Sequence, residues 1–188
     1  VDIPKDVQVA VARYTKPGPI VHKTYRPQLE PDRAAIEQLV DLLAAAERPI
    51  FYTGGGVINS GPAASQLLRE LARMTGAPVT STLMGLGAFP AASDQWLGML
   101  GMHGTYEANW AMNQADLIIA MGARFDDRVT GRLDAFSPHS RKAHIDIDRS
   151  SVNKTVRVDL PIIADVGYAL EAMIRVYKAR QHPKPDLT

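Results

Sequence analysis

The sequence contains no cysteine, so disulfide bonds and thiolate metal sites are excluded. It has no apolar run approaching the ~20 residues that span a bilayer, and its first residues do not have the pattern of a signal peptide. Net charge is only +1, and no basic run exceeds two residues, which argues against nucleic-acid binding. We therefore expect a cytoplasmic protein that binds neither a membrane nor nucleic acid.

Familiar catalytic patterns are also missing. The chain has no Ser-His-Asp arrangement, no P-loop and no HExxH helix. His103 stands between two glycines without an evident orienting partner, and we interpret it as a polar contact to a ligand or a structural hydrogen bond. We predict no catalytic residue and no metal ligand in this chain.

The composition that remains is that of one ordinary globular domain. The chain has 188 residues, of which 46% are hydrophobic and 22% charged. Residues 16–31 are rich in proline and polar side chains, and residues 181–188 contain two more prolines, so both stretches are predicted linkers. We expect a folded domain over 30–180, preceded by a remnant and linker over 1–29 and followed by a linker tail over 181–188.

Helical and strand patterns alternate through this domain. Apolar residues at helical spacing predict a first helix, with Pro31 in its first position and Asp32 in its first turn. Ser60 is predicted to cap a second helix that Gly76 closes, and Thr105 to cap a third. Short apolar strands are predicted at 50–53, 78–81, 116–121, 142–147 and 160–164, with a further short element at 95–100.

Strands of this kind, alternating with amphipathic helices, are typical of a parallel sheet that is covered on both faces. A closing helix is predicted from the spacing of Leu170, Met173, Ile174 and Tyr177. The predicted fold class is therefore α/β, a doubly wound, Rossmann-like and mostly parallel sheet of about six strands with helices on both faces.

Glycines and polar residues follow the strands of this sheet. Ligands of such sheets bind outside the carboxyl ends of the strands, and a row of clusters there suggests a long ligand such as a dinucleotide. Met84, Met99 and Met102 near this edge either line an apolar ring pocket or belong to the core. The clusters are residues 54–56, 82–85, 101–104, 122–128, 146–148 and 165–166.

The triple glycine has two interpretations. It is either a tight turn that needs positive φ, or a loop whose bare backbone approaches a pyrophosphate at a helix start. Gly54 and Gly56 fit the dinucleotide fingerprint, but its third glycine position holds Asn59. Thr82 and Leu83 stand where a ribose-binding acidic residue would follow the second strand. A conventional NAD site is therefore disfavoured.

Two arginines follow the strongest strand. Arg124 and Arg128 suit bidentate contacts to phosphate, and the alternative is a salt bridge with Asp126 or Asp127. A metal site at the two aspartates is the weaker interpretation, because neighbours on a loop point in different directions and one of them suits a helix cap.

A third group of polar residues alternates along the predicted strand over 142–147. His144, Asp146 and Asp148 share one face of this strand. They resemble a metal-ligand trio, but a terminal aspartate that accepts hydrogen bonds from a ribose or an adenine is the preferred interpretation.

Several of these segments together resemble the middle domain of the acetohydroxyacid (acetolactate) synthase family, catalytic large subunits that are thiamine-diphosphate enzymes. The resemblance covers essentially the whole chain, and the RFDDR stretch distinguishes it from pyruvate oxidase and glyoxylate carboligase. The start of the chain, VDIPKDVQ, is similar to the end of the family's preceding pyrimidine-binding domain. The matching segments are 81–87 (STLMGLG), 100–104 (LGMHG), 122–131 (GARFDDRVTG) and 144–148 (HIDID).

The resemblance implies a transferase that condenses pyruvate with a second 2-ketoacid in branched-chain amino-acid biosynthesis. It implies FAD in this domain, and thiamine diphosphate with Mg²⁺ held by flanking pyrimidine- and diphosphate-binding domains. It also implies a homodimer of catalytic subunits and a regulatory subunit as partners. The FAD-binding positions that it implies are Gly55, Thr82, Leu83, Leu100, Gly101, Met102, His103, Gly122, Ala123, Arg124, Asp126, Asp127, Arg128, Asp146, Ile147, Asp165 and Val166.

The family's activating glutamate and its Gly-Asp-Gly…Asn motif have no counterpart in this chain, so the chain alone is expected to be catalytically inactive. Alternatives remain open. They are the central domain of a pyruvate oxidase or glyoxylate carboligase type of enzyme, a stand-alone dinucleotide-binding oxidoreductase, or a scaffold domain that binds nothing.

Overall fold

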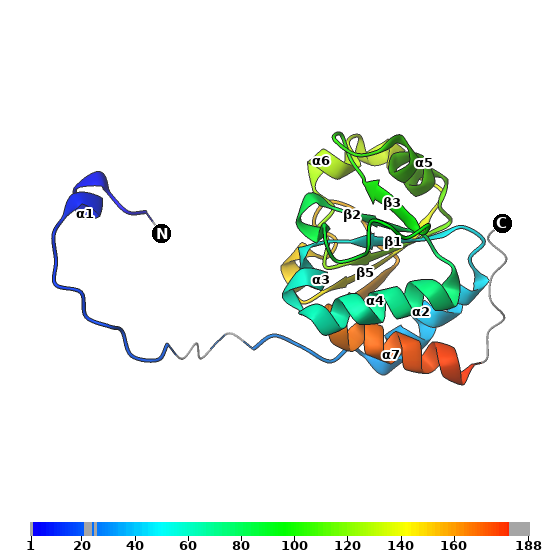
Figure 1. Ribbon diagram of the computed structural model, residues 1–188, viewed down its shortest axis with the longest axis horizontal. Helices are drawn as coiled ribbons and strands as arrows, with labels where there is room; N and C mark the ends of the chain where they lie inside the picture. Colours follow the sequence, from blue (N-terminus) through cyan, green and yellow to red (C-terminus); the bar gives the residue numbers. More distant parts are fainter. Residues whose placement is uncertain (1, 21–23, 25, 181–188) are drawn as a thin grey trace.

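The computed structural model describes residues 2–20, 24 and 26–180. From β1 onwards strands and helices largely alternate along the chain, but two helices follow β1, and only short turns of 3-10 helix separate β2 from β3 and β5 from β6 (Figure 1). The elements are α1 (Lys5–Val9), α2 (Arg33–Ala45), β1 (Pro49–Thr53), α3 (Gly55–Asn59), α4 (Pro62–Thr75), β2 (Val79–Ser81), η1 (Leu83–Gly85), β3 (Trp96–Met99), α5 (Tyr106–Gln114), β4 (Leu117–Met121), α6 (Asp127–Thr130), η2 (Leu133–Ala135), β5 (Arg141–Asp146), η3 (Arg149–Ser151), β6 (Leu160–Ile163) and α7 (Val166–Ala179).

The six strands form one sheet in the order β3-β2-β1-β4-β5-β6, and every pair is parallel. This order reverses between β1 and β4, as in dinucleotide-binding folds. Every residue of β1 and β4 is buried, which explains why these strands read as unbroken apolar runs. The predicted fold class is confirmed, and the short element expected at 95–100 is the edge strand β3.

Helices cover both faces of the sheet. α2, α4 and α7 lie together on one face and α5 on the other, as Figure 1 shows. Side chains alternate between these layers along β1, because successive residues of a strand point to opposite faces. Phe51 packs into the larger core under α2, α4 and α7, whereas Ile50 and Tyr52 pack into the smaller core beside α5.

Two predicted helix starts are wrong in detail. Ser60 does not cap α4; Gly61 does, with φ of 90°, and the Ser60 hydroxyl instead donates to the Gly56 carbonyl at 2.9 Å. Asp32 is the N-cap of α2 and accepts from the Ala35 amide, so Pro31 lies outside the helix. The predicted caps at Thr105 and Gly76 are confirmed.

The segment before α2 stands apart from the sheet. All of its described residues up to Glu30 are exposed, and Figure 1 shows α1 set away from the other helices. The first backbone tie to the domain is the Asp165 amide, which donates to the Leu29 carbonyl at 3.0 Å. The predicted tail over 181–188 lies outside the described residues.

Candidate functional site

The carboxyl ends of β1, β2, β4 and β5 meet at one edge of the sheet and enclose an open cavity of about 500 Å³. This size and place are typical of ligand sites in open α/β sheets. Both backbone turns and side chains line it. The lining residues are Tyr52, Gly55, Gly56, Asn59, Thr82, Leu83, Met84, Gly122, Ala123, Arg124, Asp126, Arg128, Val129, Asp146, Ile147 and Ser151.

Most of the predicted binding residues lie in this lining. Those that the structure brings together here are Gly55, Thr82, Leu83, Gly122, Ala123, Arg124, Asp126, Arg128, Asp146 and Ile147. The lining does not include the other predicted positions, which are Leu100, Gly101, Met102, His103, Asp127, Asp165 and Val166.

The three glycines that follow β1, Gly54, Gly55 and Gly56, have two different roles. The Gly54 and Gly56 amides donate to the carbonyls of Met121 and Gly122, at 2.9 and 3.1 Å. A Cβ on Gly56 would lie 2.5 Å from Gly122 Cα, closer than real Cβ atoms approach. Gly54 and Gly56 are therefore needed for backbone packing, whereas a Cβ on Gly55 would meet only Met84, at 3.3 Å or more. Of the three, Gly55 is the one with room beside it at the cavity.

The loop after β4 carries three of the four charged residues in the lining, which are Arg124, Asp126 and Arg128. The Arg124 guanidinium pairs with Asp126 at 2.6 Å, which is one of the two interpretations left open by the sequence. Asp126 also caps α6, where its carboxylate accepts a hydrogen bond from the Arg128 amide. This hydrogen bond holds the pKa of the Asp126 carboxyl below its ordinary value, and Arg124 lowers the pKa further. Within the described part of the chain, the exposed Arg128 guanidinium has no hydrogen-bond or ion-pair partner. It is the cation at the cavity edge that remains available to an anionic ligand.

The aspartates after β5 have different partners. Asp148 caps η3 and accepts from the backbone and hydroxyl of Ser150, so it does not face the cavity as part of a ligand trio. Asp146 accepts from the Asp148 amide at 2.8 Å and lines the cavity with Ile147. Within the described ranges, no three His, Asp or Glu side chains gather as a metal site.

The loop after β3 lies beside the cavity rather than in its lining. Leu100 is buried in the smaller core, and the Gly101 amide donates to the Asn109 side chain. The Met102 amide donates to the Arg128 carbonyl at 2.9 Å, and its side chain is exposed. This contact places 100–103 next to the arginine loop, so a long ligand that leaves the cavity here would pass over Met102 and His103.

Asp165 and Val166 begin α7. The Asp165 carboxylate accepts from the Gly167 amide and from the Ser60 hydroxyl, both at 2.8 Å, and Val166 is buried in the larger core. Both side chains are occupied by the fold, so a ligand contact here would involve the backbone or the exposed edge of the turn.

Sequence reasoning missed several lining residues, above all Tyr52. The tyrosine lies inside an apolar strand, where its ring is indistinguishable from core by pattern. Asn59 was assigned only as a departure from the glycine fingerprint. Val129 lies in the matching segment 122–131 but was not given a binding role, and Ser151 carries no motif. Met84, for which a core role was left open, lines the cavity and is largely exposed.

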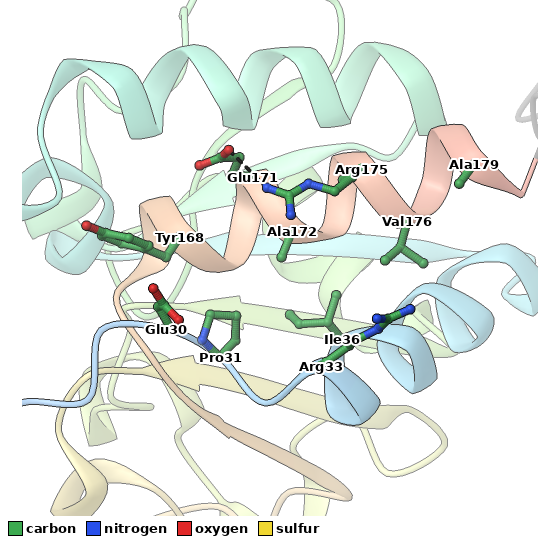
Figure 2. Close-up of a pocket in the computed structure, with 10 residues that line it drawn as sticks. All are labelled: Glu30, Pro31, Arg33, Ile36, Tyr168, Glu171, Ala172, Arg175, Val176 and Ala179. Carbon is green, nitrogen blue, oxygen red and sulfur yellow. Dashed lines mark hydrogen bonds and ion pairs between the residues drawn. The ribbon is translucent and has the colours of Figure 1, made fainter.

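A second cavity, of about 590 Å³, lies on the helical layer between the start of α2 and α7. Figure 2 shows apolar side chains of Ile36, Ala172 and Val176 along it. The charged Arg175 at its edge is paired with Glu171 one turn earlier on α7, at 3.2 Å. No predicted binding residue lines this cavity, and it lies on the helical layer rather than at the strand ends.

None of the helices that the structure describes is long and apolar enough to cross a bilayer.

Comparison with known proteins identifies the type of domain that the sequence resembles. A family model described as "Thiamine pyrophosphate enzyme, central domain" matches residues 36–173. The chain is 45% identical over 178 residues to an acetolactate synthase of Mycobacterium avium, covering 95% of this chain and 28% of that protein. It is 42% identical over 187 residues to the isozyme 3 large subunit of acetolactate synthase from Escherichia coli, covering 98% and 32%.

A third relative is the acetolactate synthase large subunit of Corynebacterium glutamicum, 43% identical over 188 residues, with 100% of this chain and 30% of that protein covered. The chain therefore spans less than a third of the length of these relatives.

Proposed function

The chain belongs to the family of thiamine pyrophosphate enzyme central domains, and from this premise we propose that it is the FAD-binding structural domain of an acetolactate synthase large subunit. The observation that carries this proposal is the cavity where β1, β2, β4 and β5 end, with Arg128 unpaired among the described residues at its edge. Relatives above 40% identity that are named as acetolactate synthases support this choice within the family.

The residues present fit a flavin dinucleotide in chemical terms. The guanidinium groups of Arg128 and Arg124 are planar donors of the kind that bind phosphate oxygens best. Arg124 would have to give up its ion pair with Asp126 to contact the ligand. Asp146 supplies carboxylate acceptors for ribose or adenine groups, and Leu83 and Met84 supply exposed apolar surface for a ring. Flavin is a redox group in general, but in this domain we propose that it serves as a structural cofactor.

The predicted contacts at 100–103, Asp127, Asp165 and Val166 stay part of the proposal. The first of these segments extends the binding surface beyond the cavity by way of the Met102 contact to Arg128. Asp165 and Val166 contribute through the backbone of the α7 turn.

We propose that the activity of the whole enzyme depends on parts outside this chain. These are pyrimidine- and diphosphate-binding domains that hold thiamine diphosphate and Mg²⁺, a second catalytic subunit and a regulatory subunit. The chain alone would then be inactive in pyruvate carboligation, residues 1–29 and 181–188 would be connections to those domains, and the enzyme would act in the cytoplasm.

The test is a titration of the chain with FAD, followed by flavin fluorescence and by the unfolding midpoint. We expect saturable binding in the wild type and a loss of about 10- to 100-fold in affinity on Arg128→Ala, since a charge-assisted hydrogen bond contributes about 1.5–3 kcal/mol. Arg175→Ala, which removes a surface arginine at the second cavity, is the matched control. Equal FAD affinity of all three proteins, or none in the wild type, contradicts the proposal.

A further inference from the structure

One polar group at the cavity is buried without a partner. Tyr52 has no exposed surface, yet its hydroxyl makes no hydrogen bond to any described residue. A buried hydroxyl left unpaired destabilises the folded state, so native proteins rarely keep one without a reason. A phenylalanine would fill the same place in β1 without that cost.

The ring of Tyr52 is held firmly. It packs edge-on against Phe125 at a centroid distance of 5.4 Å, and Phe125 packs in the same way against His144 at 5.2 Å. Phe125 has φ of 52°, a left-handed conformation that is costly for a bulky residue. This strained backbone places Phe125 in the smaller core while its neighbours Arg124 and Asp126 line the cavity.

Tyr52 belongs to the lining of the cavity. The charges of Asp126 and Arg124, which line the same cavity, both act on the pKa of its hydroxyl. Burial raises this pKa above its ordinary value, and the Asp126 carboxylate raises it further, so the hydroxyl keeps its proton. It is a hydrogen-bond donor in the lining of a site that we propose to bind an acceptor-rich ligand.

We propose that Tyr52 is a further binding residue of this site, whose hydroxyl donates a hydrogen bond to an oxygen or ring nitrogen of the bound dinucleotide at the cavity floor. This inference rests on the proposed FAD site. It does not extend to His144, whose buried ring nitrogens make no hydrogen bond to a described residue, because His144 does not line the cavity and its Nε2 lies 3.6 Å from the Asp146 carboxylate.

The Tyr52→Phe variant tests the inference with two independent readouts. Without ligand, its unfolding midpoint should equal or exceed that of the wild type, because the substitution removes an unpaired hydroxyl and keeps the ring contacts. With FAD, its dissociation constant should rise about 3- to 10-fold, the size of one neutral hydrogen bond. Tyr168→Phe is the matched control, since Tyr168 is half exposed on α7 and lines only the second cavity.

Each outcome has one meaning. Wild-type binding with an unchanged FAD affinity in Tyr52→Phe overturns this inference and leaves the FAD site standing. A lower midpoint of the ligand-free variant also overturns it, because the hydroxyl would then have a structural partner. No binding of FAD by the wild type removes the site itself, and this inference with it.

Discussion

At the scale of single residues, the cavity floor depends on backbone packing that only glycine permits. Gly122 has φ of 59°, and its Cα lies against the backbone of Gly56. The contact joins the loops after β1 and β4, the two neighbouring strands where the sheet order reverses. A side chain at either glycine would force these loops apart and deform the site above them.

Gly122→Ala is therefore expected to destabilise the fold by about 2–5 kcal/mol, the sum of left-handed strain and overpacking. Its Cβ would lie 2.4 Å from Gly56 Cα. Gly131→Ala is the control for backbone strain without a close contact, because Gly131 has φ of 55° and ψ of −129° with open space around it, and should cost about 1–3 kcal/mol. Urea unfolding measures both. Equal losses in the two variants would show that the close approach does not matter.

Asp126 gives the site a pH dependence. Its folded pKa is lowered, so the stability it contributes is fully present above the ordinary aspartate value of about 3.9 and is lost as pH falls through the folded pKa. Asp126→Asn should therefore be less stable than wild type above about pH 4, with the difference shrinking in more acidic solution. Unfolding midpoints from pH 2 to 7 measure this, with the exposed Asp94→Asn as control. A difference independent of pH would contradict the assignment.

At the scale of elements, the start of α7 connects three segments of the chain. Asp165 accepts from the Gly167 and Tyr168 amides of α7, while the hydroxyl of Ser60 reaches it from the end of α3. The same residue ties down the chain before α2 through its amide. One side chain and its amide thus connect α3, α7 and the entry to α2.

Removing this cap should be costly. Asp165→Ala is expected to destabilise the protein by about 1–3 kcal/mol, because it removes an N-cap and leaves Ser60 without one of its acceptors. Asp165→Asn should retain most of the stability, since asparagine is an equally good cap. Urea unfolding of the Asp165→Ala and Asp165→Asn variants measures this difference. Equal stability of the two variants would refute the capping role.

At the scale of the whole molecule, none of the described residues before Leu29 is buried. Apolar side chains in this segment, such as Val11 and Tyr14, are almost fully exposed. The sheet and its two helical layers are complete without them, and both hydrophobic cores are built from residues of 35–177.

Deleting residues 1–28 should therefore leave the unfolding midpoint within about 2 °C of the full chain, which corresponds to less than ~1 kcal/mol at this size. Deleting residues 1–32 is the comparison, because it also removes the Leu29 carbonyl and the Asp32 cap, and its midpoint should fall further. Calorimetry of the three proteins measures this. A large loss on the shorter deletion would place residues 1–28 within the folded unit.

The amino-acid sequence by itself determined the sheet, its direction and the edge at which the cavity lies. Unbroken apolar strands and helical spacing are local signals, and the carboxyl ends of parallel strands necessarily meet at one edge. This is why Gly55, Thr82, Arg124 and Asp146 could be assigned to one cavity from separate motifs. The residue at which a helix begins was predicted less accurately. Gly61, with positive φ, caps α4 in place of Ser60, and the Ser60 hydroxyl instead donates a hydrogen bond to Asp165.

Only the tertiary structure decided how these residues divide their roles. Gly54 and Gly56 pack against the β4 loop, Arg124 takes Asp126 as its partner, and Arg128 has none among the described residues. Tyr52 becomes a candidate binding residue because its hydroxyl is buried unpaired beside a loop about seventy residues later in the chain. Such pairings depend on distances between segments that are remote in sequence, and no local pattern encodes those distances.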